Sequence, residues 1–215
     1  LEAGIREADT LAYTHITGYV SPQMKGLDLL IETDNTNLAF LNSFIGGIFA
    51  DVSGRATGPI RLHGTFKELN LEGKAIASAS LKPRILNTPF HLINDSVILT
   101  TEAISLPHAT AFDPEGNPVK LSGQLTHRHL KNMGYDFKLN LDHACFYDTD
   151  DFGDMPFYGK IYGSGDVQLY GGGNVLNLNG RITTERGSTT TCRHLVHSPT
   201  ITLSPSWIRH RAPSR

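Results

Sequence analysis

A glycine- and leucine-rich segment that occurs twice constrains the fold of this chain more than any other feature. The first copy covers residues 54–75, GRATGPIRLHGTFKELNLEGKA, and the second covers residues 159–182, GKIYGSGDVQLYGGGNVLNLNGRI. Each copy contains Leu-x-Gly, then Leu-Asn-Leu, then a further glycine, and only Ser164 and Gly165 have no counterpart in the first copy. A segment repeated at this level of detail indicates one supersecondary unit used more than once.

Both copies alternate apolar and polar residues, which is the pattern of a strand with one apolar face. In the first copy Ile60 and Leu62 alternate with Arg61 and His63. Glycines near the expected strand ends suit tight turns, bulges or close backbone approach. Each copy therefore predicts two short strands joined at a glycine turn. An ordinary β-sandwich with one duplicated hairpin is the alternative that this pattern leaves open.

The composition is that of a turn-rich globular protein without a strong charge bias. The chain has 215 residues, of which 39% are hydrophobic and 21 are Gly, and its net charge of −2 argues against nucleic-acid binding. Its longest apolar stretch, residues 38–52, is interrupted by Asn42 and Ser43, so any membrane contact is expected outside this fragment. Cys145 is expected to be a buried free thiol, although pairing with Cys192 stays open.

Most of the remaining chain also predicts strands. Residues 1–33, 75–86 and 97–101 are strand-like, and residues 104–112 and 119–125 form a hairpin signal around the turn 113–117. The clearest strand is 135–142, with Tyr135, Phe137, Leu139 and Leu141 on one face. A single short helix is expected at about 37–46, ended by Gly46 and Gly47.

The last residues differ from the repeating part. From about residue 189 the alternation stops, and arginines accumulate among Ser, Pro and His with no acidic residue after Glu185. The sequence therefore predicts a repeating β segment at 1–188 and an irregular basic tail at 189–215, either disordered or a truncated or frame-shifted end.

No sequence pattern typical of a catalytic or metal site is complete in this chain. The acidic stretch 148–154 lacks the Glu that a calcium loop needs at its twelfth position, and His127 and His129 lack further zinc ligands at recognisable spacing. Neither a G-x-S-x-G elbow nor a phosphate loop occurs. No catalytic residue, metal site or cofactor is therefore predicted, and an enzyme is not expected.

Several short glycine- and leucine-containing motifs resemble those of the TamB family and occur in the order found in that family. TamB is the inner-membrane-anchored subunit of the translocation and assembly module of Gram-negative bacteria. The motifs are residues 54–58, 62–66 and 69–73, then 95–100, 147–153 and 157–159 with Gly163. The similarity covers roughly residues 25–188. The resemblance implies an elongated antiparallel β-groove, or β-taco, in the periplasmic part of a cell-envelope protein. It also implies kinship with AsmA-like and bridge-like lipid transfer proteins.

The partners that this resemblance implies are phospholipid acyl chains and an outer-membrane assembly protein of the BamA/TamA type. An apolar strip suits acyl chains because burial of each CH₂ contributes about 0.8 kcal/mol without directional bonds. The expected function is carriage of phospholipid between the two membranes, with support of outer-membrane protein assembly; an adhesive β-sandwich binding protein or glycan is the alternative. The expected groove-lining residues are Ile60, Leu62, Leu69, Leu71, Val97, Leu99, Val119, Leu121, Leu125, Phe137, Leu139, Leu141, Val167, Leu169, Leu176 and Leu178.

Overall fold

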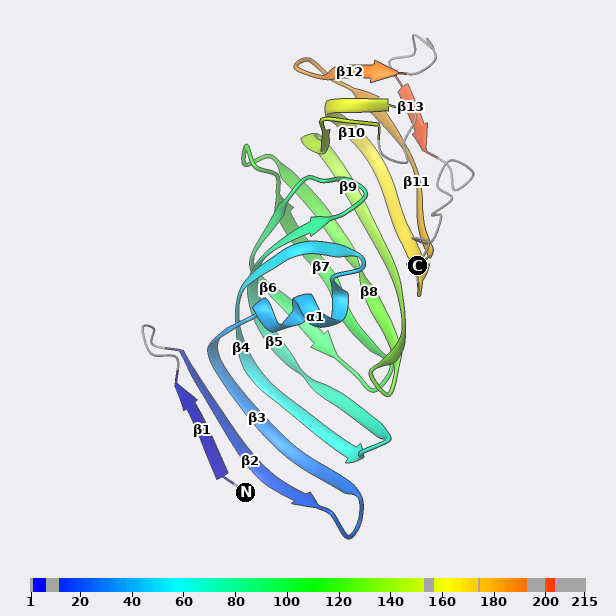
Figure 1. Cartoon of the computed structure of the whole chain (residues 1–215). Helices are drawn as coiled ribbons and strands as arrows, with labels where there is room; N and C mark the ends of the chain where they lie inside the picture. Colours follow the sequence, from blue (N-terminus) through cyan, green and yellow to red (C-terminus); the bar gives the residue numbers. More distant parts are fainter. Residues whose placement is uncertain (1, 7–11, 153–156, 174, 193–199, 204–215) are drawn as a thin grey trace.

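One antiparallel sheet accounts for nearly all of the regular structure. The computed structural model describes residues 2–6, 12–152, 157–173, 175–192 and 200–203. Within these residues, thirteen strands form a single sheet in the order β1 to β11 and then β13, while β12 pairs with β10 (Figure 1). The strands are β1 (Glu2–Arg6), β2 (Tyr13–Ser21), β3 (Gly26–Asn37), β4 (Phe49–Thr65), β5 (Glu68–Pro83), β6 (Phe90–Leu99), β7 (Ala103–Phe112), β8 (Pro118–Arg128), β9 (Lys131–Thr149), β10 (Phe157–Gly172), β11 (Val175–Thr184), β12 (Thr189–Cys192) and β13 (Thr200–Leu203).

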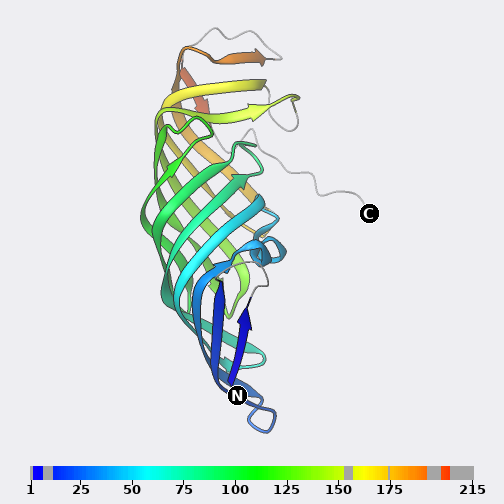
Figure 2. The same ribbon diagram turned by 90° about the vertical axis from the view of Figure 1, so that its left-hand side faces the viewer.

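The sheet is a single curved layer rather than two packed layers. Figure 2 shows it bowed, with the short helix on its concave side. The strand path begins at β1 and ends at β13, so within the described residues the sheet is open. The predicted all-β antiparallel groove is therefore confirmed, and the β-sandwich alternative is wrong for this part of the chain. No helix in the described ranges combines the length and the apolar character that crossing a membrane requires.

The two copies of the repeat fold as equivalent hairpins. The first copy spans parts of β4 and β5, where Leu62 pairs with Leu71, and the second spans parts of β10 and β11, where Leu169 pairs with Leu178. The extra Ser164 of the second copy lies at a register shift between β9 and β10. An inserted residue that bulges out of one strand in this way keeps the flanking pairs aligned.

The predicted short strands are wrong, because β4 has 17 residues and β5 has 16. The predicted glycine turn holds for the second copy, where Gly173 lies in the β10–β11 turn, but not for the first, where the turn lies at residues 66–67. Gly64 lies inside the strand with φ +123°, and a Cβ there would be 2.3 Å from the Glu68 carbonyl oxygen. At the equivalent Gly171 a Cβ would be 2.1 Å from the Val175 carbonyl oxygen. These glycines therefore permit close backbone approach in continuous strands and do not end them.

The short helix lies where the sequence predicts it. A 3₁₀ turn, η1 (Ala39–Leu41), leads into α1 (Asn42–Ile45), and Gly46 is its C-cap. The amide oxygen of Asn37 accepts a 2.8 Å hydrogen bond from the Ala39 N–H, as expected for a capping residue. Asn42 then fixes the helix to β4, because its side chain donates to the Val52 carbonyl at 2.7 Å and accepts from the Val52 N–H at 2.9 Å.

Two other expectations need correction. The strand expected at 97–101 ends at Leu99, because Thr100 bonds back to Ala103 in the tight β6–β7 turn. Within the expected irregular tail, β12 and β13 are strands, because their backbones find open partners on β10 and β11. Residues 193–199 and 204–215 lie outside the described residues, and the division of the chain at 188 stays a prediction.

Candidate functional site

Strand register places the predicted groove-lining residues on one face of the sheet, here called the apolar face. Directly paired residues of antiparallel strands share a face, as do residues two apart along a strand. Leu62 pairs with Leu71 at one end of the sheet, and Leu121, Leu139 and Val167 form a row at the other. The rows are linked through β6 and β7, because Gly73 pairs with Leu99 and Leu99 with Ile104. The alternation predicted for 135–142 is confirmed in the same register.

The opposite face, here called the outer face, is mostly polar and carries ion pairs, although Leu30, Ile76 and Ile98 are exposed on it. Arg61 donates to both carboxylate oxygens of Asp28, from Nε at 2.8 Å and from Nη2 at 2.6 Å. His63 contacts Glu72 at 3.2 Å one row further on. The sheet therefore separates an apolar side from a hydrated side, and each side is continuous across many strands.

Part of the apolar face is covered by the chain itself. The predicted lining residues in this part are buried, with exposed fractions between 0% and 8%, and we call it the covered half. They pack in one core cluster with Ile45, Phe49, Val52 and Leu86, which come from α1, β4 and the β5–β6 connection. The members of the covered half are Val119, Leu125, Phe137, Leu139, Leu141, Val167, Leu169 and Leu178.

Phe49 shows how the cover is attached. Its ring packs edge-on against Phe137, with 5.9 Å between centroids and an interplanar angle of 78°. The β5–β6 connection is attached in turn to β9, because the Asp148 N–H donates to the Leu86 carbonyl at 3.1 Å and the Asn87 side chain donates to the Asp148 carbonyl at 2.6 Å. Residues distant in sequence thus close over the β8–β11 part of the face.

The rest of the apolar face has less cover. Five of the predicted residues are half-buried and lie outside the core cluster, and we call this part the open half: Ile60, Leu62, Leu69, Leu71 and Leu99. Val97 and Leu121 are half-buried but pack against the cluster, so they mark the boundary between the halves. Leu176 pairs with Gly171 on the same face, but its side chain is outside what the structure describes.

Sequence reasoning missed part of this face. Leu27, Leu29 and Ile31 of β3 continue the open half, since they pair with Gly64, Leu62 and Ile60. Their alternation in the sequence, Leu-x-Leu-x-Ile, predicts a strand with one apolar face, but it does not show which strand pairs with it. Only the register shows that β3 extends the same apolar strip.

One rim of the groove is held by contacts between hairpin tips. The β8–β9 tip reaches the β4–β5 tip, because His129 Nδ1 lies 3.0 Å from Asn70 Oδ1 and Lys131 Nζ donates to the Lys67 carbonyl at 3.2 Å. These tips lie on either side of the β6–β7 turn, where the His127 N–H donates to the Glu102 carbonyl at 2.8 Å. These contacts therefore join the two tips across the shorter β6–β7 hairpin.

Few titratable groups lie in the buried regions. His127 is 6% exposed and its Nε2 has no partner in the described ranges, so burial holds its pKa below the usual value. Burial raises the pKa of Tyr135 to about 12, and its hydroxyl donates to the Val175 carbonyl at 2.9 Å. Neither group forms an acid–base pair on the apolar face.

The possible metal ligands do not converge. No group of three or more His, Cys, Asp or Glu side chains suited to a metal occurs among the described residues, which include His127, His129 and the acidic stretch up to Asp151. Asp154 lies outside them. Cys145 is a buried free thiol, as predicted, and burial raises its pKa to about 11.

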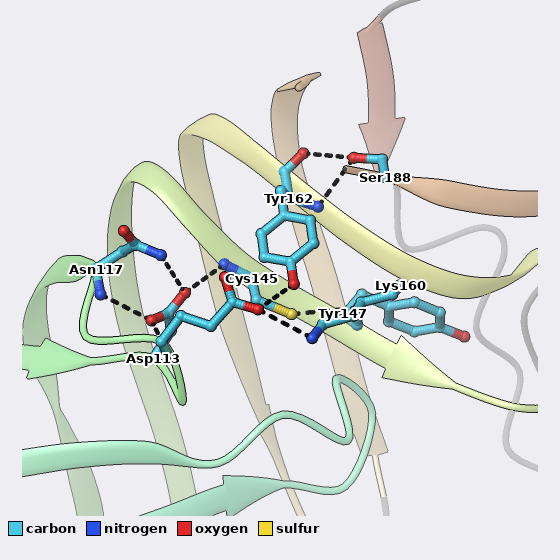
Figure 3. Close-up of polar contacts among 8 residues, drawn as sticks. Asp113, Asn117, Cys145, Tyr147, Lys160, Tyr162 and Ser188 are labelled. Atoms are coloured by element: carbon cyan, nitrogen blue, oxygen red, sulfur yellow. Dashed lines mark hydrogen bonds and ion pairs between the residues drawn. The ribbon is translucent and has the colours of Figure 1, made fainter. Parts of the chain in front are cut away.

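A polar cluster anchors the β7–β8 turn to β9 (Figure 3). Asp113 is 2% exposed, and its Oδ1 accepts the N–H groups of Glu115 and Asn117 at 2.9 and 2.8 Å. Its Oδ2 accepts the Cys145 N–H at 2.7 Å and the Asn117 side-chain amide at 2.9 Å. Burial works against ionisation of this carboxyl, but the four hydrogen bonds outweigh it and lower its pKa.

A second set of contacts joins the same turn to β10. Glu115 accepts hydrogen bonds from the Tyr162 hydroxyl and from Lys160 Nζ, the latter at 3.1 Å. Those bonds hold the pKa of Glu115 below its usual range. Ser188 bonds to both backbone polar groups of Tyr162 at 3.1 Å (Figure 3). The cluster thus fixes the β7–β8 turn to β9 and β10 at the end of the covered half, and its polar groups hydrogen-bond to one another.

Comparison with known proteins agrees with this architecture. Residues 108–206 match the family model described as the TamB C-terminal domain. The matched segment begins in β7, includes the second copy of the repeat and reaches past β13, while the first copy lies before it. No curated protein and no solved structure matches the chain. The family match, together with the open antiparallel sheet, supports assignment of residues 108–206 to the TamB family.

Proposed function

We propose that the open half of the apolar face carries phospholipid acyl chains between the inner and outer membranes. One observation carries the proposal: a continuous apolar face runs across the sheet, and the chain's own core covers β8–β11 and parts of β5–β7 but leaves Ile60, Leu62, Leu69, Leu71 and Leu99 outside it. Half-buried leucines at positions 62, 69, 71 and 99, together with Ile60, are the residues that would contact the chains.

The chemistry of this face suits passage better than fixed binding. Burial of each CH₂ contributes about 0.8 kcal/mol and imposes no direction. Neighbouring rows such as Leu29–Leu62–Leu71 and Ile31–Ile60 present similar aliphatic groups, so a chain shifted by one row has nearly the same energy. Charged headgroups would stay in water at the groove mouth, because transfer of an unpaired charge into an apolar site is costly.

The covered half would not contact lipid, and the lipid-binding part of the groove would end where the covered half begins. Its rings and aliphatic side chains are close to fully buried, which leaves them little surface for a ligand. Acyl chains would therefore lie over β3–β6 and meet Val97 and Leu121 at the boundary. This assignment restricts the sixteen expected lining residues to the open half and its margin.

Support of outer-membrane protein assembly, with a partner of the BamA/TamA type, is the second part of the proposal. It is supported by the match to the TamB C-terminal domain over residues 108–206 and by a sheet whose two outermost strands, β1 and β13, lie at the ends of an open strand path. Unpaired strand edges can accept a further strand by backbone hydrogen bonding.

Extraction of lipid from the purified chain tests the proposal. The chain is purified without detergent and its organic extract is analysed by mass spectrometry. Phospholipid is expected in the wild-type extract at a level well above that of an unrelated β-protein prepared in the same way. Leu71→Asp should reduce the amount of bound phospholipid, whereas Lys74→Asp on the outer face should leave it unchanged. An extract free of phospholipid would contradict the proposal, and so would equal amounts of lipid in the wild type and in Leu71→Asp.

A further inference from the structure

The outer face has a depression of about 740 Å³ that the proposed lipid path does not use. It lies over strands β6–β11, on the side of the sheet opposite the covered half. This volume is in the usual range of small-molecule sites, about 300–1,000 Å³. Its polar floor includes Lys120, Lys138, Arg181, Asn140, Gln168 and Asn179.

Register arranges these side chains in two parallel rows. Lys120 pairs with Asn140, Asn140 with Asp166, and Asp166 with Arg181. In the next row Ser122 pairs with Lys138, Lys138 with Gln168, and Gln168 with Asn179. Three strand spacings of about 4.8 Å place the backbones of Lys120 and Arg181 roughly 14 Å apart, with Lys138 between them in the second row.

The charges in the depression are not balanced. Lys120, Lys138 and Arg181 make no ion pair within the described residues, whereas Arg61 and Lys160 elsewhere are paired with carboxylates. Two carboxylates, Asp95 and Asp166, and His108 also line the depression.

Both carboxylates are already engaged by neutral groups. Asp166 accepts from the Asn140 side chain at 2.9 Å, and Asp95 Oδ1 accepts from the Thr110 N–H at 3.4 Å. Asp95 Oδ2 is buried without a partner in the described ranges. Neutral donors leave both carboxylates charged, so three cations face two carboxylates and the depression has an excess of one positive charge, which favours an anion.

We propose that this depression binds a phosphorylated sugar about two rings long. Lys120 and Arg181 would hold phosphates at its two ends, and Lys138 would reinforce the negative charge between them. The amides of Gln168 and Asn179 can both donate to and accept from ring hydroxyls. The binding site for the sugar is separate from the apolar face, because the sheet backbone lies between them. The ligand is the sugar phosphate in solution, and no lipid tail takes part.

Isothermal titration of the full chain with a bisphosphorylated maltose tests this site. Unphosphorylated maltose and inorganic phosphate are the ligand controls. The bisphosphorylated sugar is expected to bind at least tenfold more tightly than either control, and added salt should weaken it because the contacts are ionic. Lys138→Ala and Arg181→Ala should each raise the Kd about tenfold, the effect of one charge-assisted hydrogen bond.

Lys74→Ala provides the matched control, because Lys74 is an exposed lysine of the outer face on β5, away from the depression. It should leave the Kd unchanged. Thermal melting checks that each variant is folded, and Arg181→Lys should restore part of the affinity. The proposal is overturned if the wild type does not bind the bisphosphorylated sugar or if phosphate alone binds as tightly. It is also overturned if Lys74→Ala weakens binding as much as Lys138→Ala, or if only vesicles displaying the sugar are bound.

Discussion

At the scale of single residues, Asp113 shows how a buried charge can organise a turn. Its carboxylate accepts four hydrogen bonds, three from its own turn and one from the Cys145 N–H of β9. The predicted turn is confirmed, because the Gly116 N–H donates to the Asp113 carbonyl and Gly116 has φ +88°. The sequence could not show that the same carboxylate also reaches β9, since that contact joins residues 32 apart.

Replacement of Asp113 by Asn should reduce the free energy of unfolding by about 2–3 kcal/mol near pH 7, because an NH₂ group would face the donors of Asn117 and Cys145. Urea unfolding of both proteins measures the difference. The lowered pKa of Asp113 means that its contribution is fully present above the unfolded-state pKa of about 3.9 and is lost as pH falls through the folded-state value. The difference between the two proteins should therefore shrink below about pH 4, and a difference that stays constant would contradict this role.

At the scale of strands and hairpins, the pairing within the two repeated hairpins could be predicted from the sequence, whereas the burial of the second part of β9 could not. Pairing of Leu62 with Leu71 and of Leu169 with Leu178 follows from motifs that can be aligned by eye. The second part of β9 departs from its own pattern, because His143 has φ +55° at a register irregularity. Beyond it Ala144, Cys145, Phe146 and Tyr147 are all buried. Consecutive burial there depends on distant segments that cover both faces, and no local periodicity encodes it.

The close-approach glycines give a prediction at the same scale. Gly64→Ala should lower the free energy of unfolding by about 1–3 kcal/mol, because φ +123° strains an L-residue and the new Cβ would meet the Glu68 carbonyl. Gly47→Ala is the control, since a Cβ at Gly47 has no neighbour within 4 Å. Chemical denaturation of both variants measures the contrast. Equal stabilities would show that the repeat glycines have no backbone role.

At the scale of the whole molecule, the sequence predicted one apolar face, but it did not predict that this face is divided into a covered half and an open half. Alternation shows which residues share a face, yet the cover comes from α1, the start of β4 and the β5–β6 connection, whose positions depend on long-range packing. Phe49, for example, lies in an interrupted apolar stretch and gives no sign that it packs on Phe137. Leu29 and its strand were recognisable as apolar, but only the fold places them beside Leu62.

The two halves should respond differently to an introduced charge. Leu139→Asp should cost about 3–5 kcal/mol, because an unpaired carboxylate would be placed at a site that is 6% exposed. Leu62→Asp, in the open half, should cost only about 1 kcal/mol and leave a cooperative unfolding transition. Thermal or urea unfolding monitored by circular dichroism compares them. Similar losses in both variants would indicate that the open half is as tightly covered as the core.

The most direct measurement is photo-crosslinking to phospholipid vesicles from two adjacent leucines of β3. Leu29 lies on the open half beside Leu62, whereas Leu30 lies on the outer face beside Arg61 and is 41% exposed. A benzophenone side chain introduced at either position has the same chemistry and nearly the same depth along the strand. We predict lipid adducts from position 29 and few or none from position 30. Adducts of equal yield from both positions, or from position 30 alone, would contradict the account of the apolar face as the path for acyl chains.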